Sequence, residues 1–245
     1  MTFWQNQVVL VTGASRGIGR ELAIRFSALG AKVAINYVSN QARAEEVLAL
    51  CNAENTRLYQ ADVGNEDDVT KMVEQIETDL GEVTILVNNA GQTRDGLLMM
   101  MSAENWKSVL STHLDGAFYC SRAVMRGMVS NKFGRVINIT SVSGIKGTAG
   151  QCNYSAAKAG LIGFTRALSR EMGRKKITCN AVALGVIDTE MTQDLSADVL
   201  QAYKDSTSLK RFGQTSEVAD LVEFLASDKS NYLTGQVITL DGGLV

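Results

Sequence analysis

Short runs of β-branched and other apolar residues alternate with longer segments of helical periodicity along this chain of 245 residues. Strands that are apolar throughout and alternate with helices are typical of a parallel sheet covered by helices on both faces. The sequence therefore predicts an α/β protein with a doubly wound, seven-stranded parallel sheet. Because we find no linker, repeat or low-complexity stretch, we expect residues 1–245 to form a single domain.

The periodicity gives approximate bounds for each element. The expected strands cover residues 8–11, 32–37, 57–61, 84–87, 135–139, 177–182 and 236–240. The expected helices cover residues 18–29, 43–50, 67–80, 106–128, 154–172 and 217–226. Residues 188–211 interrupt the alternation with polar, weakly periodic sequence, and two interpretations remain open. The segment is either a lid over a site or a short helical excursion with no gating role.

Composition excludes several classes of protein. The formal net charge is −2, and the Lys and Arg residues are scattered among acids, so no basic face for nucleic acid is expected. No apolar run approaches the roughly 18 residues of a membrane span, and the amino terminus does not resemble a signal peptide, which predicts a cytoplasmic protein. The spacing of the four cysteines indicates neither a metal site nor a disulfide framework: Cys51, Cys120, Cys152 and Cys179.

A glycine-rich segment, Thr12 to Gly19, follows the first expected strand and opens the first helix. This context suits the dinucleotide-binding turn of a Rossmann fold, in which backbone amides at a helix start hold a pyrophosphate. The candidate cofactor contacts in the turn are Gly13, Ser15, Arg16, Gly17, Ile18 and Gly19. The alternative is a strand-to-helix turn that is rich in glycine for steric reasons only.

Polar residues follow three further expected strands. The segment Asn36 to Asn40 lacks the carboxylate that binds the ribose diol of NAD, whereas Arg16 and Arg43 suit a 2′-phosphate, so NADP(H) is the expected cofactor. Ligands of open α/β sheets lie at the carboxyl ends of strands, where this chain has Asp62-Val63 and Asn88 to Gly91. Alternatively, Asp62 caps a helix and the asparagine pair forms a turn.

Tyr154 and Lys158 lie four residues apart in an expected helix, with Ser141 thirteen residues before the tyrosine. That spacing brings both side chains onto one face, with Cβ atoms about 5–6 Å apart. A cation so close to a phenol favours the phenolate, so we expect Lys158 to lower the pKa of Tyr154 from its usual ~10. The pair is therefore a candidate acid and base.

Thr12 to Gly19, Asn88 to Gly91, Ser141 and the Tyr154/Lys158 pair, in this order, resemble the short-chain dehydrogenase/reductase family over nearly the whole chain. Within that family the chain is most similar to the β-ketoacyl-ACP reductase branch of fatty acid synthesis. Three segments carry this second resemblance: Thr93 to Met99, Asn153 to Phe164 and Leu240 to Gly243.

The resemblance implies a role for each matching residue. Tyr154 would protonate the carbonyl oxygen of the substrate, Ser141 would donate a hydrogen bond to it, and Lys158 would hold the nicotinamide ribose. Ser143 is the rival of Ser141, but the family's serine lies thirteen residues before the tyrosine. The resemblance also implies cofactor contacts at Asn89, Ala90, Gly91, Ile187 and Thr189, and the strand-end position adds Asp62 and Val63 as candidates.

Two residues depart from the family pattern. His113 stands where many members carry a catalytic Asn that holds a water for proton resupply. It is the only histidine of the chain and either preserves the relay or is a helix residue without a part in turnover. Leu184 stands where the family usually has Pro, so we expect a more mobile loop after that strand.

The resemblance also implies partners. An acidic acyl carrier protein would dock near Lys132 and Lys175, flanked by Arg174 and Lys176, beside the mouth of the active site, although basic residues at helix ends also favour the dipole. A homotetramer is implied, with helices 106–128 and 154–172 packed against symmetry mates. Small residues permit their close approach: Ala156, Ala157, Ala159 and Gly160.

The expected activity is NADPH-dependent reduction of a 3-oxoacyl thioester, carried on acyl carrier protein, to the 3-hydroxyacyl thioester. Two alternatives remain. One is a reductase of a specialised polyketide-like or acyl-CoA pathway. The other, suggested by His113, is a weakly active nucleotide-binding subunit of a partner reductase.

Overall fold

The computed structural model describes residues 3–193 and 197–245. Seven parallel strands form one sheet in the order β3-β2-β1-β4-β5-β6-β7. The order reverses direction at β1, which confirms the predicted doubly wound α/β sheet. The strands are β1 Val8–Val11, β2 Lys32–Tyr37, β3 Thr56–Gln60, β4 Ile85–Asn88, β5 Gly134–Ser141, β6 Ile177–Leu184 and β7 Val237–Leu240.

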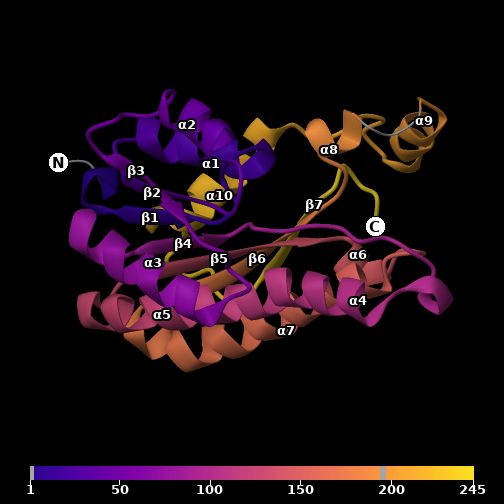
Figure 1. The fold of residues 1–245 in the computed structure, drawn as a ribbon. Helices are drawn as coiled ribbons and strands as arrows, with labels where there is room; N and C mark the ends of the chain where they lie inside the picture. The colour runs from indigo at the N-terminus through magenta and orange to yellow at the C-terminus, as the bar shows by residue number, and fades with distance from the viewer. Residues whose placement is uncertain (1–2, 194–196) are drawn as a thin grey trace.

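Helices cover both faces of the sheet (Figure 1). The longer helices in the described parts are α1 Gly17–Ala28, α2 Gln41–Leu48, α3 Glu66–Asp79, α4 Ala103–Leu110, α5 Gly116–Asn131, α7 Cys152–Met172, α9 Ala197–Ser206 and α10 Thr215–Ala226. Shorter turns are η1 Phe3–Asn6, η2 Leu98–Met100, η3 Ser111–Asp115, α6 Ser143–Lys146, η4 Gly173–Lys175, α8 Glu190–Gln193 and η5 Asp228–Ser230.

The sheet has a separate apolar core on each face. Val9 and Val11 of β1 pack with α1 and α10, whereas Val8 and Leu10 pack with α3 and α5. Successive side chains of a strand point to opposite faces, so a strand buried on both sides has to be apolar throughout. This requirement explains the uninterrupted apolar runs of the sequence.

The helix expected at 106–128 is divided in the structure. A π-helical turn, η3, separates α4 from α5 and carries His113. At its start the Ser111 hydroxyl donates to the carbonyl oxygen of Gly64, and at its end Gly116 packs directly on Val63. The helix therefore adjusts to the loop after β3, and π-helical turns occur frequently at functional sites.

The segment after β6 leaves the layers of the sheet. Within residues 188–211 the described parts form α8 and α9, which lie beyond the sheet edge, and residues 194–196 fall outside the described residues (Figure 1). A helical excursion is thus present, whereas gating remains a hypothesis. Leu184 itself is buried and pairs with both Ser141 of β5 and Leu240 of β7, so the position where the family has Pro belongs to the sheet rather than to a loop.

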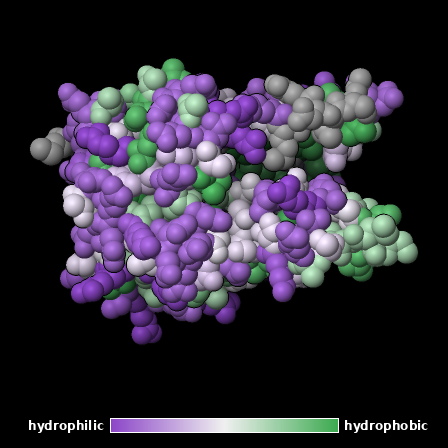
Figure 2. Space-filling model, viewed as in Figure 1, coloured by the Kyte–Doolittle hydropathy of each residue, from purple (hydrophilic) through white to green (hydrophobic). Residues whose placement is uncertain are grey.

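The surface is hollowed at the carboxyl edge of the sheet, between the helices after β6 and an apolar projection on the other side (Figure 2). Four consecutive side chains are largely exposed on that projection, at Leu97, Leu98, Met99 and Met100. No helix in the described residues is long and apolar enough to cross a membrane.

Candidate active site

The turn between β1 and α1 has the shape that a pyrophosphate requires. Gly13 has a φ of +61°, and a Cβ there would lie 2.8 Å from the Cα of Ala90. A Cβ on Gly19 would lie 2.5 Å from the carbonyl oxygen of Gly13. A Cβ on Gly17, by contrast, would meet only Thr189, at 3.7 Å. The turn is therefore packed tightly on the protein side and open at the helix start, so these residues fit a dinucleotide.

Two buried polar side chains hold the turn in place. Asn36 accepts a hydrogen bond from the amide of Gly13 at 3.1 Å and donates to the carbonyl oxygen of Ala61 at 3.0 Å. The hydroxyl of Thr12 accepts from the amides of Asn89 and Ala90, each at 3.0 Å. Sequence reasoning missed both roles, although the signal for Asn36 was a polar residue near the end of an apolar strand.

The loop after β4 supports the turn from the other side. The Asn89 side chain donates to the carbonyl oxygens of Thr12 at 2.9 Å and Gly13 at 3.2 Å. Ala90 contacts Gly13, and Gly91 lies against the ring of His113, where a Cβ would come within 2.3 Å of Cε1. The hydrogen bonds of Asn89 therefore fix the backbone of the turn. Positions 90 and 91 of the loop after β4 have room for small residues only.

The residues after β3 contribute less directly. The carboxylate of Asp62 accepts from the amide of Gly64 at 2.9 Å, which makes a local turn, and α3 is capped by Asn65 instead. The interpretation of Asp62 as a helix cap is thus wrong. Val63 is buried against Gly116. Asp62 itself is exposed at the carboxyl end of β3.

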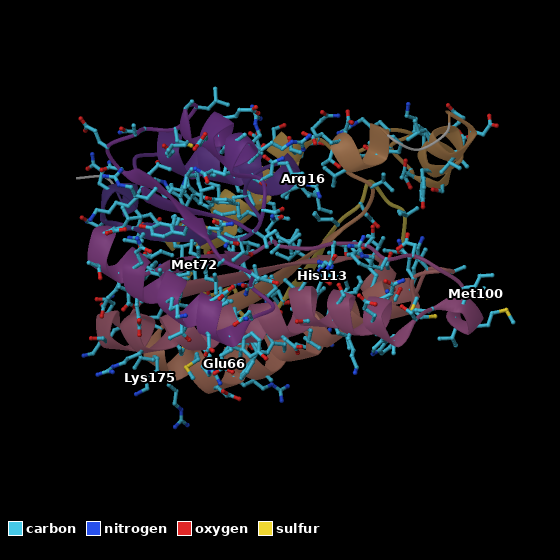
Figure 3. All side chains as sticks on the ribbon, viewed as in Figure 1. Arg16, Glu66, Met72, Met100, His113 and Lys175 are labelled. Carbon is cyan, nitrogen blue, oxygen red and sulfur yellow. The ribbon has the colours of Figure 1, made fainter. Side chains whose placement is uncertain are left out.

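The two arginines expected at a 2′-phosphate, Arg16 and Arg43, differ in whether they form an ion pair. Arg16 is exposed at the start of α1 (Figure 3). Arg43 is engaged: its guanidinium lies 2.5 Å from the carboxylate of Glu190 in α8. Of the two, only Arg16 has no ion pair with a described residue.

Ser141, Tyr154 and Lys158 come together at the same edge of the sheet. Ser141 ends β5, close to Tyr154 in the first turn of α7, and its hydroxyl accepts a hydrogen bond from the amide of Ser143 at 3.1 Å. Lys158 follows one turn later, with Nζ 5.4 Å from the centroid of the tyrosine ring. The lysine is buried and donates to the carbonyl oxygen of Ile139 at 2.7 Å. The predicted set is therefore assembled next to the glycine turn.

Burial dominates the electrostatics of this set. It lowers the pKa of Lys158 to about 7, because a buried ammonium loses its hydration. It also raises the pKa of Tyr154 to about 12, although the hydrogen bond with Ser141 acts in the opposite direction. The prediction that Lys158 lowers the pKa of Tyr154 is wrong for the protein without cofactor. Its physical error was to weigh the neighbouring charge and neglect desolvation.

The rival serine is occupied elsewhere. The hydroxyl of Ser143 lies 2.9 Å from that of Thr148 and 3.3 Å from the side-chain oxygen of Gln151. Asn153, which sequence reasoning missed, is fully buried and donates to the carbonyl oxygen of Arg94 at 2.9 Å. This contact fixes the start of α7, and hence Tyr154, against the loop before α4.

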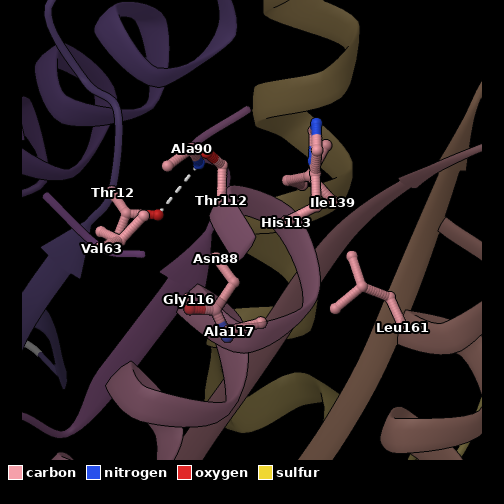
Figure 4. Close-up of a pocket in the computed structure, with 10 residues that line it drawn as sticks. All are labelled: Thr12, Val63, Asn88, Ala90, Thr112, His113, Gly116, Ala117, Ile139 and Leu161. Carbon is pink, nitrogen blue, oxygen red and sulfur yellow. Dashed lines mark hydrogen bonds between the residues drawn. The ribbon is translucent and has the colours of Figure 1, made fainter. Parts of the chain in front are cut away.

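His113 lies directly beside the tyrosine. The two rings meet edge to face, with centroids 5.2 Å apart and planes at 88°. Nε2 of His113 lies 2.8 Å from the carbonyl oxygen of Gln92, whereas Nδ1 has no hydrogen-bond partner among the described residues. Burial, and then the charge of Lys158, lower the pKa of His113 to about 3, so the ring is neutral near pH 7. It also borders a cavity of about 10 Å³ beneath the turn (Figure 4).

The segment after β6 covers the other side of the site. Ile187 is buried and forms an isolated parallel bridge with Gly213. Thr189 is half-buried and lies over Gly17, where a Cβ would meet the methyl group of Thr189 at 3.7 Å. Both residues thus lie where a nucleotide on the turn would pass beneath them.

The basic residues expected beside the mouth lie elsewhere. Lys132 follows α5 and precedes β5, and Lys175 follows α7, so both lie at the amino-terminal edge of the sheet. The 21 residues of α7 separate Lys175 from the Tyr154 end by roughly 30 Å. Figure 3 shows Lys175 and Met100 at opposite ends of the molecule. The expected place beside this chain's own mouth is therefore wrong.

The small residues of α7 also divide into two groups. Ala156 and Ala159 are exposed, as the expected helix packing between subunits requires. Ala157 is fully buried within the chain, and a Cβ on Gly160 would meet Leu114 at 2.9 Å. Gly160 therefore serves the packing of α7 on η3, and Ala157 is not available to a surface between subunits.

Comparisons with known proteins match the whole length of the chain. A family model described as enoyl-(acyl carrier protein) reductase matches residues 13–245. The 3-oxoacyl-[acyl-carrier-protein] reductase of Synechocystis is 44% identical, with 100% of this chain and 99% of that protein covered. The reductase of this name from Pseudomonas aeruginosa is 46% identical with 98% of each chain covered, and that from Staphylococcus epidermidis is 43% identical with 98% and 99% covered.

Proposed function

Because the chain belongs to the short-chain dehydrogenase/reductase family, we propose that it reduces a 3-oxoacyl thioester to the 3-hydroxyacyl thioester with NADPH. The observation that carries the proposal is the assembly of Ser141, Tyr154 and Lys158 beside an open dinucleotide turn. Relatives that are 43–46% identical are named 3-oxoacyl-[acyl-carrier-protein] reductases, which supports the same carrier here, and we propose a cytoplasmic location.

The cofactor would lie across the carboxyl ends of the strands. The amides of Gly17, Ile18 and Gly19 would hold the pyrophosphate, while Arg16 would pair with the 2′-phosphate. Further contacts are proposed at Gly13, Ser15, Asp62, Val63, Asn89, Ala90, Gly91, Ile187 and Thr189. When bound, the reduced nicotinamide supplies the hydride.

Tyr154 supplies the proton in this proposal. With its pKa raised to about 12, its hydroxyl stays protonated near pH 7, which is the form that a general acid requires. Ser141 donates a hydrogen bond to the same carbonyl oxygen and stabilises the charge that develops there. Lys158, with its pKa at about 7, exchanges protons readily and stabilises the phenolate that remains on Tyr154.

His113 would take the place of the family's asparagine as a neutral group. Its Nε2 lies within hydrogen-bond distance of both the amide of Gln92, at 3.1 Å, and the carbonyl oxygen of Gln92, at 2.8 Å. In the tautomer that is protonated at Nε2, the ring would donate to that carbonyl oxygen and leave Nδ1 to accept. It would thereby support proton resupply to Lys158 without becoming charged itself. Its edge contact with Tyr154 also restricts the position of the phenol ring.

The decisive test is Tyr154→Phe. We expect turnover of NADPH with a 3-oxoacyl thioester to fall by about 100-fold or more, since general acids contribute ~10²–10⁴-fold. Tyr232, whose side chain is fully exposed, provides the control, and Tyr232→Phe should retain wild-type turnover. If wild-type protein binds NADPH but is no faster than Tyr154→Phe, the alternative of a nucleotide-binding subunit of a partner reductase is favoured.

Arg16→Ala tests the choice of cofactor. The loss of a charge-assisted pair with phosphate is expected to weaken NADPH binding about 10- to 100-fold and to leave NADH binding nearly unchanged. Titration of purified wild type and variant with NADPH and with NADH measures the two affinities. Equal losses for the two cofactors would exclude Arg16 from the 2′-phosphate.

The carrier is tested through the basic residues at the amino-terminal edge. Because Lys132 and Lys175 lie far from their own Tyr154, we propose that they receive the carrier protein for a neighbouring subunit. Lys132→Glu with Lys175→Glu should raise KM for carrier-protein thioesters and leave KM for CoA thioesters unchanged. If wild type prefers CoA thioesters, the alternative of an acyl-CoA or polyketide-like pathway is favoured.

The neighbouring subunit implies an assembly, proposed here as a homotetramer. The exposed Trp106 of α4 and Phe118 of α5, together with exposed Ala156 and Ala159 of α7, support helix packing between subunits. Sedimentation analysis of wild type and Phe118→Asp measures this directly. We expect a tetramer for wild type and smaller species for the variant.

A further inference from the structure

An ion pair joins two segments that border the proposed adenosine site. Arg43 lies in the first turn of α2, and Glu190 is the first residue of α8. Their guanidinium and carboxylate groups are 2.5 Å apart, although 147 residues separate them in the chain. The contact therefore connects the helix after β2 with the helix that follows β6.

Both partners are held next to the turn by independent contacts. The backbone amide of Arg43 donates to the side chain of Asn40, the cap of α2, which fixes the arginine at the helix start. One residue before Glu190, Thr189 lies over Gly17. The pair thus spans the opening above the glycine turn, on the side where β2 ends.

This position is the one at which NADP(H) and NAD(H) differ. Asn36, just before β2 ends at Tyr37, is buried and bonded to the glycine turn, and residues 38–40 lead from β2 to α2. An adenosine ribose bound there would present its 2′-phosphate to the start of α2. A phosphate monoester carries about −1.5 to −2 charge near pH 7 and is a strong acceptor for guanidinium.

We propose that Glu190 competes with the 2′-phosphate for Arg43 and thereby sets how strongly the protein prefers NADP(H) to NAD(H). This inference rests on the proposed cofactor. Binding of a ligand with a 2′-phosphate breaks the pair and releases α8 from α2, whereas a ligand without that phosphate leaves the pair intact. Glu190 is in this sense a specificity-determining residue that touches no cofactor atom.

The pair is weak enough to be displaced. The side chains of Arg43 and Glu190 are 42% and 53% exposed, and exposed pairs contribute little in water. Competition from such a pair lowers the affinity for the phosphate by about two- to fivefold at most. Removing the carboxylate of Glu190 should therefore raise the affinity for ligands that carry a 2′-phosphate by the same two- to fivefold. It should leave the affinity for other ligands unchanged.

Glu190→Gln in the full-length protein tests the inference without turnover. Calorimetric titration with adenosine 2′,5′-bisphosphate, compared with adenosine 5′-monophosphate, isolates the 2′-phosphate. We expect the bisphosphate to bind about two- to fivefold more tightly to the variant than to wild type, and the monophosphate to bind equally to both. The same comparison with NADPH and NADH extends the result to the whole cofactor.

Two further variants separate the pair from general charge effects. Asp220→Asn removes an exposed carboxylate that pairs with Arg25 on α1 and should change neither affinity. In an Arg43→Gln background, Glu190→Gln should have no effect on bisphosphate binding, because the partner is gone. A gain that persists in that background would overturn the inference and indicate long-range repulsion instead.

The remaining outcomes are equally clear. If Glu190→Gln weakens both ligands to the same degree, the pair acts as a strap over the cleft, and the inference is wrong. If it changes neither, Arg43 does not meet the phosphate, and the inference is again wrong. The proposed function is judged separately, by whether wild type prefers the bisphosphate and loses that preference in Arg16→Ala.

Discussion

The glycine turn and the group formed by Tyr154, Lys158 and His113 lie at the same edge of one sheet, yet they are built in opposite ways. In the turn, buried polar groups are paired: Asn36 and Thr12 together engage amides and carbonyls on three loops. In the catalytic group, burial displaces the pKa values of all three side chains, and Nδ1 of His113 has no partner among the described residues.

The difference follows from what each region has to do. A turn that binds a fixed negative charge needs donors that are rigid and already oriented, and satisfied hydrogen bonds provide this at no cost to stability. Groups that transfer protons need pKa values moved away from those in water, and desolvation moves them only at a cost in folding free energy. The turn should therefore stabilise the fold, whereas the catalytic group should weaken it.

The largest expected effect is that of Lys158→Met, which should abolish activity and stabilise the protein. Burial that lowers the pKa of Lys158 to about 7 costs roughly 1.4 kcal/mol for each pKa unit at neutral pH. Because this cost exceeds the roughly 1 kcal/mol of the lost hydrogen bond to Ile139, we expect urea denaturation at pH 7 to show a gain in the free energy of unfolding of the order of a few kcal/mol.

The pH dependence provides the control for this variant. Between pH 7 and 10.5 the unfolded chain binds a proton at Lys158 that the folded protein does not. The free energy of unfolding of wild type therefore rises across this range. The advantage of Lys158→Met should be greatest at or below pH 7 and shrink toward pH 10.5. A variant that is less stable than wild type at pH 7 would contradict the comparison.

Gly13→Ala should have the next largest effect, on binding. The added Cβ would lie 2.8 Å from the Cα of Ala90 at a φ of +61°, so the turn has to shift. We expect NADPH affinity to fall about tenfold or more, with a loss of about 1–3 kcal/mol in the free energy of unfolding. Gly173→Ala is the matched control, because Gly173 has helical dihedrals and open space around it.

The control itself has an expected sign. Since its φ and ψ suit alanine, Gly173→Ala should stabilise the protein by about 0.4–1 kcal/mol and leave cofactor binding unchanged. Thermal unfolding and cofactor titration measure both variants side by side. Equal binding losses in the two variants would show that the shape of the turn is not what matters.

Asn36→Ala tests whether the hydrogen bonds of the turn stabilise the fold. The change leaves the amide of Gly13 and the carbonyl oxygen of Ala61 without this partner inside the protein. We expect the free energy of unfolding to fall by about 1–3 kcal/mol, as for other buried groups that lose a partner. Denaturant titration measures this loss. An unfolding midpoint equal to that of wild type would contradict the idea that the turn stabilises the fold whereas Lys158 weakens it.

The smallest effect is expected at His113. Its pKa of about 3 keeps the ring neutral, so the activity of wild type should show no ionisation of this residue between pH 5 and 8. The turnover of His113→Asn should stay within about threefold of wild type, because imidazole and amide side chains both donate and accept hydrogen bonds without charge. As the chain has one histidine, its imidazole ¹⁵N shifts report the titration directly. A midpoint near pH 6.5 would contradict the burial argument.

Sequence reasoning succeeded where the signal was local. The seven strands, the glycine turn after β1 and the Tyr154/Lys158 spacing follow from periodicity and from the geometry of a single helix or turn. It failed where contacts with a segment distant in the sequence determine the local structure. Ser111 meets Gly64 and Gly116 meets Val63, so the helix expected at 106–128 is divided by a π-helical turn that no periodicity showed.

The same limit explains one of the other differences. Arg43 was expected near a phosphate, and the expectation did not include its ion pair with Glu190, which lies in a segment whose place is fixed by the fold of the whole chain. Lys132 and Lys175 were expected beside the mouth, but both precede strands and therefore lie at the opposite edge of the parallel sheet. The partner of Arg43 does not follow from the residues around it, whereas the place of the two lysines follows from the expected strands that come directly after them and was overlooked.

The sequence by itself determined the class of fold, the turn that suits a dinucleotide, and the residue types available for proton transfer, because backbone period and side-chain chemistry are local properties. Only the tertiary structure decided the ionisation of those residues. A helical spacing shows that a lysine is near a tyrosine, whereas the water removed from both depends on β5, η3 and α7 packing around them. Here desolvation outweighs the neighbouring charge, and it raises the pKa of Tyr154 and lowers that of Lys158.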